Sequence, residues 1–131
     1  YTVFVFARIL SNGRLISDDS NFIMGSWMGT QNVYHPHNWV WNSGGPFGNG
    51  WRSHCVTGDF ANDNWKVYAN GVKLAENNGG YYGFTNITWG IWNSSQEPCA
   101  GHFSVFLIYD RVLTDAEVLQ NHEALRGRYG I

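Results

Sequence analysis

The stretch that decides the fold is Trp65-Lys66-Val67-Tyr68-Ala69-Asn70-Gly71-Val72-Lys73-Leu74. Two short apolar strands flank an Asn-Gly pair, which is the strongest short-range signal for a tight two-residue turn. Both central residues of such a turn have positive φ, a conformation that Asn and Gly adopt more readily than other residues. The stretch therefore predicts a β-hairpin closed by Asn70 and Gly71.

A second informative stretch runs from Gly101 to Val118. Its apolar run, His102 to Tyr109, predicts a buried, central strand, after which the chain enters the one convincing helix. Thr114 and Glu117 have the spacing of a capping box, in which each side chain accepts a hydrogen bond from a free backbone N–H group of the first turn. Apolar residues at helical spacing follow, and Gly127 supplies a stop.

These two segments, together with Trp51-x-x-x-Cys55-x-Thr57 and Trp89-Gly90, follow a known order and spacing. The chain resembles the laminin-G-like branch of the concanavalin A-like lectin and glucanase superfamily. The resemblance covers at least Trp51 to Arg126. It implies an all-β, two-sheet antiparallel jelly-roll sandwich with one short C-terminal helix, and a single laminin-G-like domain over residues 1–131. Members of this branch usually carry one or two further strands before the strand that corresponds to the start of this sequence. We therefore expect the chain to be the C-terminal part of a longer protein.

Composition agrees with an all-β domain and argues against a nucleic-acid partner and a membrane span. The 131 residues include 16 Gly and 17% aromatic residues but only 14% charged residues, which is typical of β-sheets joined by polar turns. A net charge of −2 provides no basic stripe, so we expect no nucleic-acid partner. No run approaches the ~18 apolar residues of a spanning helix, so we expect no membrane span.

The rest of the chain reads as short strands separated by turn signals, which favours consecutive antiparallel strands. Thr2 to Ile9 is an almost unbroken apolar run, as in a strand covered on both faces. Trp51, Trp65 and Trp89 lie inside predicted strands, at positions where the resembled family has core residues. The further strands that we predict cover residues 21–27, 38–41, 51–58 and 87–91.

The acidic residues of this sequence do not have the spacing of a glucanase active site. The glucanases of this superfamily place carboxylates as E-x-D-x-E on one strand, so that alternate residues face one groove. This sequence has no such triplet, and its acidic residues lie singly at turns or on the helix. We therefore expect that the protein is not an enzyme.

Two cysteines, Cys55 and Cys99, leave two alternatives open. They allow one disulfide, if their Cα atoms lie within about 7 Å. A buried free thiol at Cys55 is an equal alternative, because unpaired cysteines are among the most buried residues.

Calcium is the metal to consider, because several laminin-G-like and legume-lectin relatives hold it between loops. Asp59, Asn62 and Asp63 lie in segment 59–64, which is rich in oxygen-bearing side chains. Calcium takes about six to eight oxygen ligands, several of them charged. The alternative is that Asp and Asn occur here because turns favour them.

Aromatic residues give the best indication of function. Flat rings pack on the apolar C–H faces of sugars, while Asn and backbone groups bind the hydroxyls. Trp39 and Trp41 alternate on the predicted strand 38–41, so we expect both to face one way. The alternative is that these rings fill the rim of the sandwich or contact another protein. The predicted ligand-binding residues are Trp39, Trp41, Tyr81, Tyr82, Trp92 and Asn93.

The sequence thus predicts a non-catalytic glycan-binding or adhesion module whose partner is carbohydrate. We expect it in an extracellular, cell-surface or virion-surface protein. The alternative is a structural subunit, or a decoration or attachment module of a phage virion or surface assembly, that packs against neighbouring protein subunits. The ending Leu125 to Ile131 is similar to endings of laminin-G-like domains in phage and bacterial surface proteins, which keeps this alternative open.

Overall fold

The computed structural model describes residues 1–131 except residues 20, 43–44, 46–47, 82, 84–85 and 93–95. The described residues form nine strands and one C-terminal helix. The strands are β1 (Thr2–Ile9), β2 (Arg14–Ser17), β3 (Phe22–Trp27), β4 (Thr30–Pro36), β5 (Trp51–Asp59), β6 (Asn64–Ala69), β7 (Val72–Asn77), β8 (Thr88–Trp89) and β9 (Gly101–Tyr109), and the helix is α1 (Asp115–Arg126).

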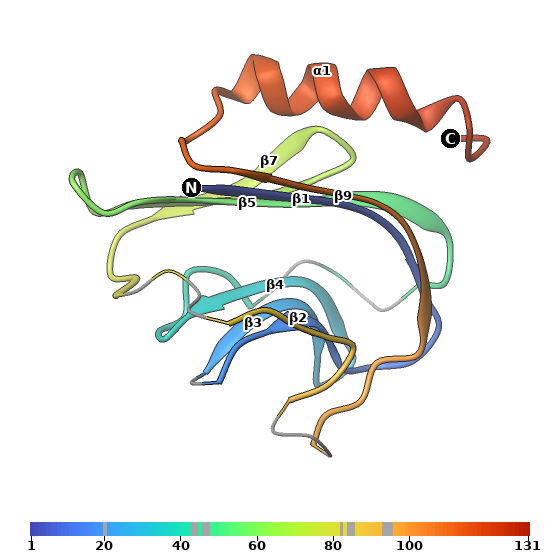
Figure 1. The fold of residues 1–131 in the computed structure, drawn as a ribbon, viewed down its shortest axis with the longest axis horizontal. Coiled ribbons are helices and arrows are strands. Elements are labelled where there is room, and N and C mark those ends of the chain that lie inside the picture. Colours follow the sequence, from blue (N-terminus) through green and yellow to red (C-terminus); the bar gives the residue numbers. More distant parts are fainter. Residues whose placement is uncertain (20, 43–44, 46–47, 82, 84–85, 93–95) are drawn as a thin grey trace.

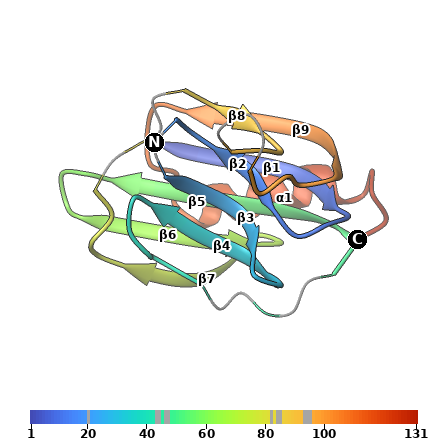
Figure 2. The same ribbon diagram turned by 90° about the horizontal axis from the view of Figure 1, so that it is seen from below.

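These elements form three layers (Figure 1). A five-stranded antiparallel sheet of order β7-β6-β5-β1-β9 lies in the middle, with α1 across one face. A four-stranded antiparallel sheet of order β4-β3-β2-β8 covers the other face. Figure 2 looks onto the smaller sheet, with the larger sheet and then α1 behind it. The predicted two-sheet antiparallel sandwich with one short C-terminal helix is confirmed.

Strand β1, inside the larger sheet, is buried on both faces. Val3 and Val5 belong to the core between the two sheets, whereas Phe4 and Phe6 belong to a second core between the larger sheet and α1. A strand covered on both faces needs apolar residues at consecutive positions. The unbroken apolar run at the start of the sequence is therefore explained, and the prediction from it is confirmed.

Strands β6 and β7 form the predicted hairpin. Asn70 at φ 51° and Gly71 at φ 76° are the turn residues, between the paired Ala69 and Val72. The turn also packs under α1, because a Cβ atom on Gly71 would lie 2.9 Å from Leu119 Cδ1. Glycine is therefore required here for its backbone conformation and for its size.

Helix α1 begins with the predicted capping box. Thr114 Oγ1 accepts a hydrogen bond from the backbone N–H of Glu117 at 3.3 Å, and Glu117 Oε2 accepts one from the N–H of Thr114 at 2.8 Å. Hydrogen bonds from Arg111 and Thr114 to this carboxylate lower the pKa of Glu117 to about 2.

In the described chain, no helix is long and apolar enough to cross a membrane.

Three expectations about the strands are wrong. Strand β9 is neither central nor buried. It lies at the edge of the larger sheet, because only β1 pairs with it among the described strands, and its Phe103 and Ile108 are 40% and 47% exposed. Residues 38–41 form no strand, since they turn back onto β4 and make a single bridge between Tyr34 and Trp41. Trp89 is 40% exposed and not a core residue, because it lies in the two-residue edge strand β8. Trp51 is half-buried, and Trp65 is fully buried as predicted.

Candidate functional site

The outer face of the smaller sheet, which is turned away from the larger sheet, is covered by side chains from loops and from the end of β3. Phe22, Met24 and Tyr34 point into the core between the sheets. Alternate residues of a strand point to opposite faces, so Ile23 and His35 point outwards. Ile23 and His35 are nevertheless only 3% and 8% exposed. Other side chains must therefore lie over this face.

Three of these covering residues are Trp27, Trp39 and Trp92, which we call the tryptophan cluster. Trp27 ends β3, Trp39 lies in the turn after β4, and Trp92 follows β8. The Trp39 ring centre lies 5.0 Å from that of Trp27 and 4.7 Å from that of His35. All three tryptophans are half-buried, so that part of each side chain remains open to solvent.

An ion pair links two members of the tryptophan cluster, Trp27 and Trp92. Arg14, which is 2% exposed, donates through Nε to Glu97 Oε2. The other Glu97 oxygen accepts a hydrogen bond from Trp27 Nε1 at 3.3 Å. The guanidinium carbon of Arg14 lies 4.0 Å from the centre of a Trp92 ring, which is cation–π geometry. These contacts hold the rings in place within the folded chain, which reduces the ordering that binding would require.

The chemistry of the tryptophan cluster suits an uncharged, ring-shaped ligand. Partly open indole faces can pack on the C–H faces of a sugar. The exposed amide of Gln96 lies next in the chain to Glu97, where it can exchange hydrogen bonds with hydroxyl groups. The Asn38 amide already donates to the Gly79 carbonyl and accepts from the Trp39 N–H. Burial lowers the pKa of His35 beneath the cluster, so this imidazole is neutral at pH 7.

The structure separates the predicted ligand-binding residues. Trp39 and Trp92 belong to the tryptophan cluster. Trp41 packs against the core between the sheets, and its buried Nε1 has no hydrogen-bond partner among the described residues. The expectation that Trp39 and Trp41 face one way is thus wrong, because the chain turns between them. Tyr81 is 61% exposed, and its N–H donates to the carbonyl of Pro36.

Two other predicted ligand-binding residues, Tyr82 and Asn93, lie outside the described residues.

The loop considered for calcium uses its oxygen atoms for hydrogen bonds within the turn. Asp59 accepts bonds from the backbone and side-chain N–H groups of Asn62. Asp63 Oδ1 accepts bonds from the N–H of Gly79 and from Trp65 Nε1. The Asn62 side chain and the Gly79 N–H are the main causes that lower the pKa of Asp59 and Asp63, respectively. The described residues include no group of three or more His, Cys, Asp or Glu that could hold a metal ion. The residues do not form a ready calcium site, and calcium binding here stays a prediction.

Both cysteines are free thiols in this structure. Cys55 is buried in the core under α1, and Cys99 is half-buried near Ser11. Burial raises the pKa of Cys55 well above its usual range and that of Cys99 to about 11, so neither thiol ionises at neutral pH. Of the two alternatives, the structure has the buried thiol.

Sequence reasoning missed Trp27 and the pair Arg14–Glu97. Trp27 ends an apolar strand, so its pattern is that of a core residue. Arg14 and Glu97 are 83 positions apart, and nothing in the sequence indicates that β2 meets the segment before β9.

A second surface lies at the open edge of the sandwich, between β8 and β9. An open cavity of about 310 Å³ is lined there by Trp89, Phe103, Ser104, Val105 and Phe106. The Phe103 and Trp89 rings meet edge to face at 5.1 Å. Both side chains are 40% exposed, so this edge presents apolar surface to solvent.

Fold and site together define a two-sheet antiparallel β-sandwich with an aromatic surface on its smaller sheet. The crystal structure of a protein from Bacteroides ovatus, provisionally named a carbohydrate-binding protein, has a similar fold over 91% of this chain. The TM-score is 0.66 and the sequence identity is 18%, so the likeness shows the fold alone. The chain covers 40% of that protein's length. No family model and no curated protein matches the chain.

Proposed function

We propose that the chain is a non-catalytic, laminin-G-like module that binds a glycan on the tryptophan cluster. The observation that carries the proposal is the fixed position of three partly open indole rings on one face of the smaller sheet. A protein of similar fold with a provisional carbohydrate-binding name supports the same function. Glycans are displayed on cells and on particles, so we place the module outside the cell, on a cell surface or on a virion.

Rigid aromatic surfaces bind sugars at low entropic cost. An indole ring has two side-chain torsions, and here contacts with Arg14, Glu97 and His35 already restrict them. Binding therefore orders little of the protein. The affinity then depends on the apolar area that the sugar covers and on hydroxyl contacts at the margin of the cluster.

A glycan array followed by calorimetry on the bound glycan tests this function. We expect Trp39→Ala to weaken binding at least tenfold, because the sugar loses a stacking surface. Trp89→Ala is the matched control, since it removes another partly exposed tryptophan at the open edge of the sandwich. Equal binding by both variants and the unchanged protein would contradict the proposal, as would an array without any bound glycan.

Absence of catalysis is tested separately. Incubation with laminarin, agarose, carrageenan and xylan is expected to release no reducing ends above a heat-inactivated control. Release that disappears when Glu97 is changed to Gln would assign the module to an enzyme.

One observation favours a second candidate function, that of a structural module in a surface assembly or virion. Strand β9 is a nine-residue edge strand without an Asp, Glu, Lys or Arg residue, and such edges pair readily with other strands. The neighbour that we consider is a second copy, paired edge to edge. Light scattering should then show a dimer that Phe103→Lys dissociates, whereas a monomer at all concentrations would exclude this function.

A further inference from the structure

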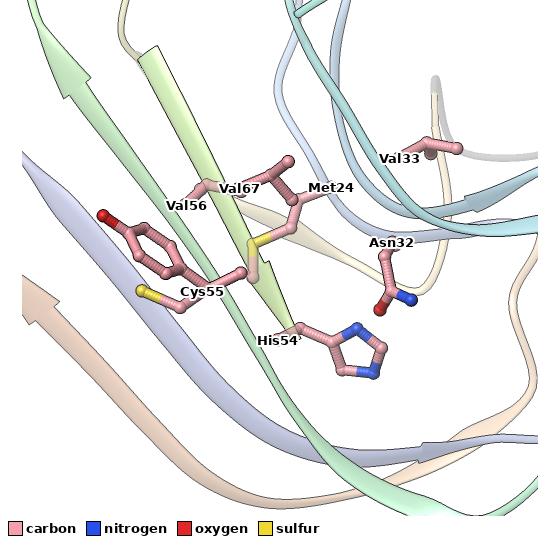
Figure 3. A pocket seen from close by; sticks show the side chains of 9 residues that line it. Met24, Asn32, Val33, His54, Cys55, Val56 and Val67 are labelled. Carbon is pink, nitrogen blue, oxygen red and sulfur yellow. The ribbon is translucent and has the colours of Figure 1, made fainter. Parts of the chain in front are cut away.

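The cavity in the core between the two sheets is too small for a ligand. Figure 3 shows the His54 ring of β5 directed towards Asn32 of β4, with Met24, Val56 and Val67 around them. The ring is 2% exposed, and neither of its nitrogens has a hydrogen-bond partner among the described residues. The cavity beside it leaves no room for a water molecule. This part of the sandwich therefore accommodates no ligand.

A polar cavity of about 150 Å³ lies at the surface, where strand β9 is followed by helix α1. It is lined by the last residue of β9, by the segment between the two elements and by one face of α1: Tyr109, Arg111, Leu113, Glu117, Gln120 and Asn121. The helix lies on one face of the larger sheet and the smaller sheet covers the other (Figure 1). The cavity is therefore on the helix side of the larger sheet, away from the tryptophan cluster.

The charged groups of this cavity neutralise each other. Arg111 donates from Nη1 and Nη2 to the two carboxylate oxygens of Glu117, at 3.0 Å and 2.7 Å. The carboxylate is ionised at neutral pH, because its hydrogen bonds lower the pKa of Glu117 to about 2. No other Asp, Glu, Lys, Arg or His of the described chain lines the cavity. The site thus favours a ligand without net charge.

Neutral polar groups around the cavity keep hydrogen-bonding capacity for such a ligand. Asn121 Nδ2 donates to the Tyr109 hydroxyl oxygen at 3.0 Å, so the hydroxyl proton and Asn121 Oδ1 remain for other partners. The Gln120 amide is exposed and forms no hydrogen bond with the part of the chain that the structure describes. Each of these groups can exchange hydrogen bonds with hydroxyl groups, which both donate and accept.

The cavity also has an apolar wall and a small volume. Leu113 and the ring of Tyr109 belong to the core under α1, and Leu113 is buried whereas Tyr109 is half-buried. Such a wall can pack on the C–H face of a sugar. Pockets for drug-sized ligands have volumes of roughly 300–1,000 Å³, so the smaller cavity suits a single sugar ring.

We propose that this cavity is a second carbohydrate site, which binds one neutral sugar ring through the side chains of Tyr109, Gln120 and Asn121. The inference goes beyond the proposed function, because the cavity shares no residue with the tryptophan cluster. A sugar here and a glycan on the cluster can be bound at the same time. Two separate sites on one module would raise its avidity for a surface that displays many glycans.

An NMR titration of isotope-labelled protein tests the second site. The ligands are the methyl glycosides of glucose, galactose, mannose and N-acetylglucosamine, and a glycan bound on the array. We expect at least one glycoside to shift the side-chain amide signals of Gln120 and Asn121 in a saturable manner. Gln120→Ala and Asn121→Ala should each weaken this binding about fivefold, as expected for the loss of one hydrogen bond. Trp39→Ala should leave it unchanged.

Asn78→Ala is the matched control for Gln120→Ala. It removes another exposed amide, on the segment after β7, and neither side chain has a hydrogen bond to lose among the described residues. Equal binding of the glycosides by both variants would overturn the inference, as would the absence of amide shifts with every glycoside. If the array glycan then shifts the indole signals alone, the proposed function stands without the second site. Amide shifts with no indole shift for any ligand would support the second site and contradict the proposed function.

Discussion

Arg14 and Trp92 stack, with the guanidinium carbon 4.0 Å from the indole ring centre, although they come from β2 and from the segment after β8. The contact makes a buried cation part of a surface aromatic cluster. Arg14 is satisfied on its other sides by Glu97, by the carbonyl of Phe22 and by Asn21 Oδ1. Arg14 therefore helps to hold the rings in place, and the carboxylate of Glu97 balances the charge of Arg14.

Removing Glu97 tests that support. Glu97→Ala leaves Arg14 buried without its anion, so we expect the free energy of unfolding to fall by about 1–3 kcal/mol. Glu123→Ala is the control, because its ion pair with Arg126 is solvent-exposed and worth at most about 1 kcal/mol. Urea unfolding measures both variants. Equal losses of stability in the two variants would mean that Arg14 is more accessible to water than the structure shows.

The hairpin turn requires glycine at position 71, so a substitution there should destabilise the protein. Gly71→Ala combines positive φ with a contact to Leu119, so we expect a loss of more than about 1 kcal/mol in the free energy of unfolding. Gly127→Ala is the control, since Gly127 has φ −60° and open space around it. We expect this second change to be neutral or slightly stabilising. If thermal melts rank the two variants the other way, the packing of the hairpin under α1 is wrong.

The capping box predicts a measurable loss at the start of α1. Thr114→Ala removes the acceptor for the Glu117 N–H and should cost about 1 kcal/mol of stability. Thr114→Ser keeps the hydroxyl group and should retain most of that stability. A denaturant midpoint that is unchanged in the Ala variant, at an unchanged slope, would count against the capping box.

Acid should destabilise the protein through His54. Its pKa is about 3 in the folded chain, whereas it is near 6.5 when the chain unfolds. Between these values only the unfolded state takes up the proton, so stability is complete above pH 6.5 and falls as the pH decreases towards 3. The expected loss is roughly 1.4 kcal/mol for each pH unit in that window.

His54→Leu should remove this contribution, because leucine is apolar and has no proton to bind. Denaturant melts from pH 7 to pH 4 should therefore show a smaller loss of stability in the variant. Parallel pH curves for the two proteins would contradict the isolated, neutral histidine. The other buried imidazoles, such as His122, whose pKa burial also lowers, remain in both proteins and act equally on them.

Local patterns predicted the parts of the fold that local chemistry controls. The turn at Asn70-Gly71 and the cap at Thr114 depend on residues within one turn of chain, and both are confirmed. The edge position of β9 depends on what lies beside it in space, which an apolar run does not encode. Strands β2 and β4 escaped prediction because Arg14 and the polar stretch Gln31-Asn32 interrupt their apolar pattern.

The candidate site was predicted only in part, for the same reason. Trp39 and Trp92 were named from composition, since aromatic residues beside Asn and Gly are typical of sugar surfaces. Trp27, Arg14 and Glu97 join them through contacts between distant segments. Such contacts follow from sheet order, which the sequence pattern does not specify.

The central claim is that a glycan contacts the tryptophan cluster, and indole N–H signals in an NMR titration test it most directly. The titration would use a glycan bound on the array and isotope-labelled protein. We expect the signals of Trp27, Trp39 and Trp92 to shift with ligand concentration, while those of buried Trp65 and of Trp89 at the open edge stay in place. Shifts confined to Trp89, or no shift of any indole signal at saturating glycan, would contradict the account.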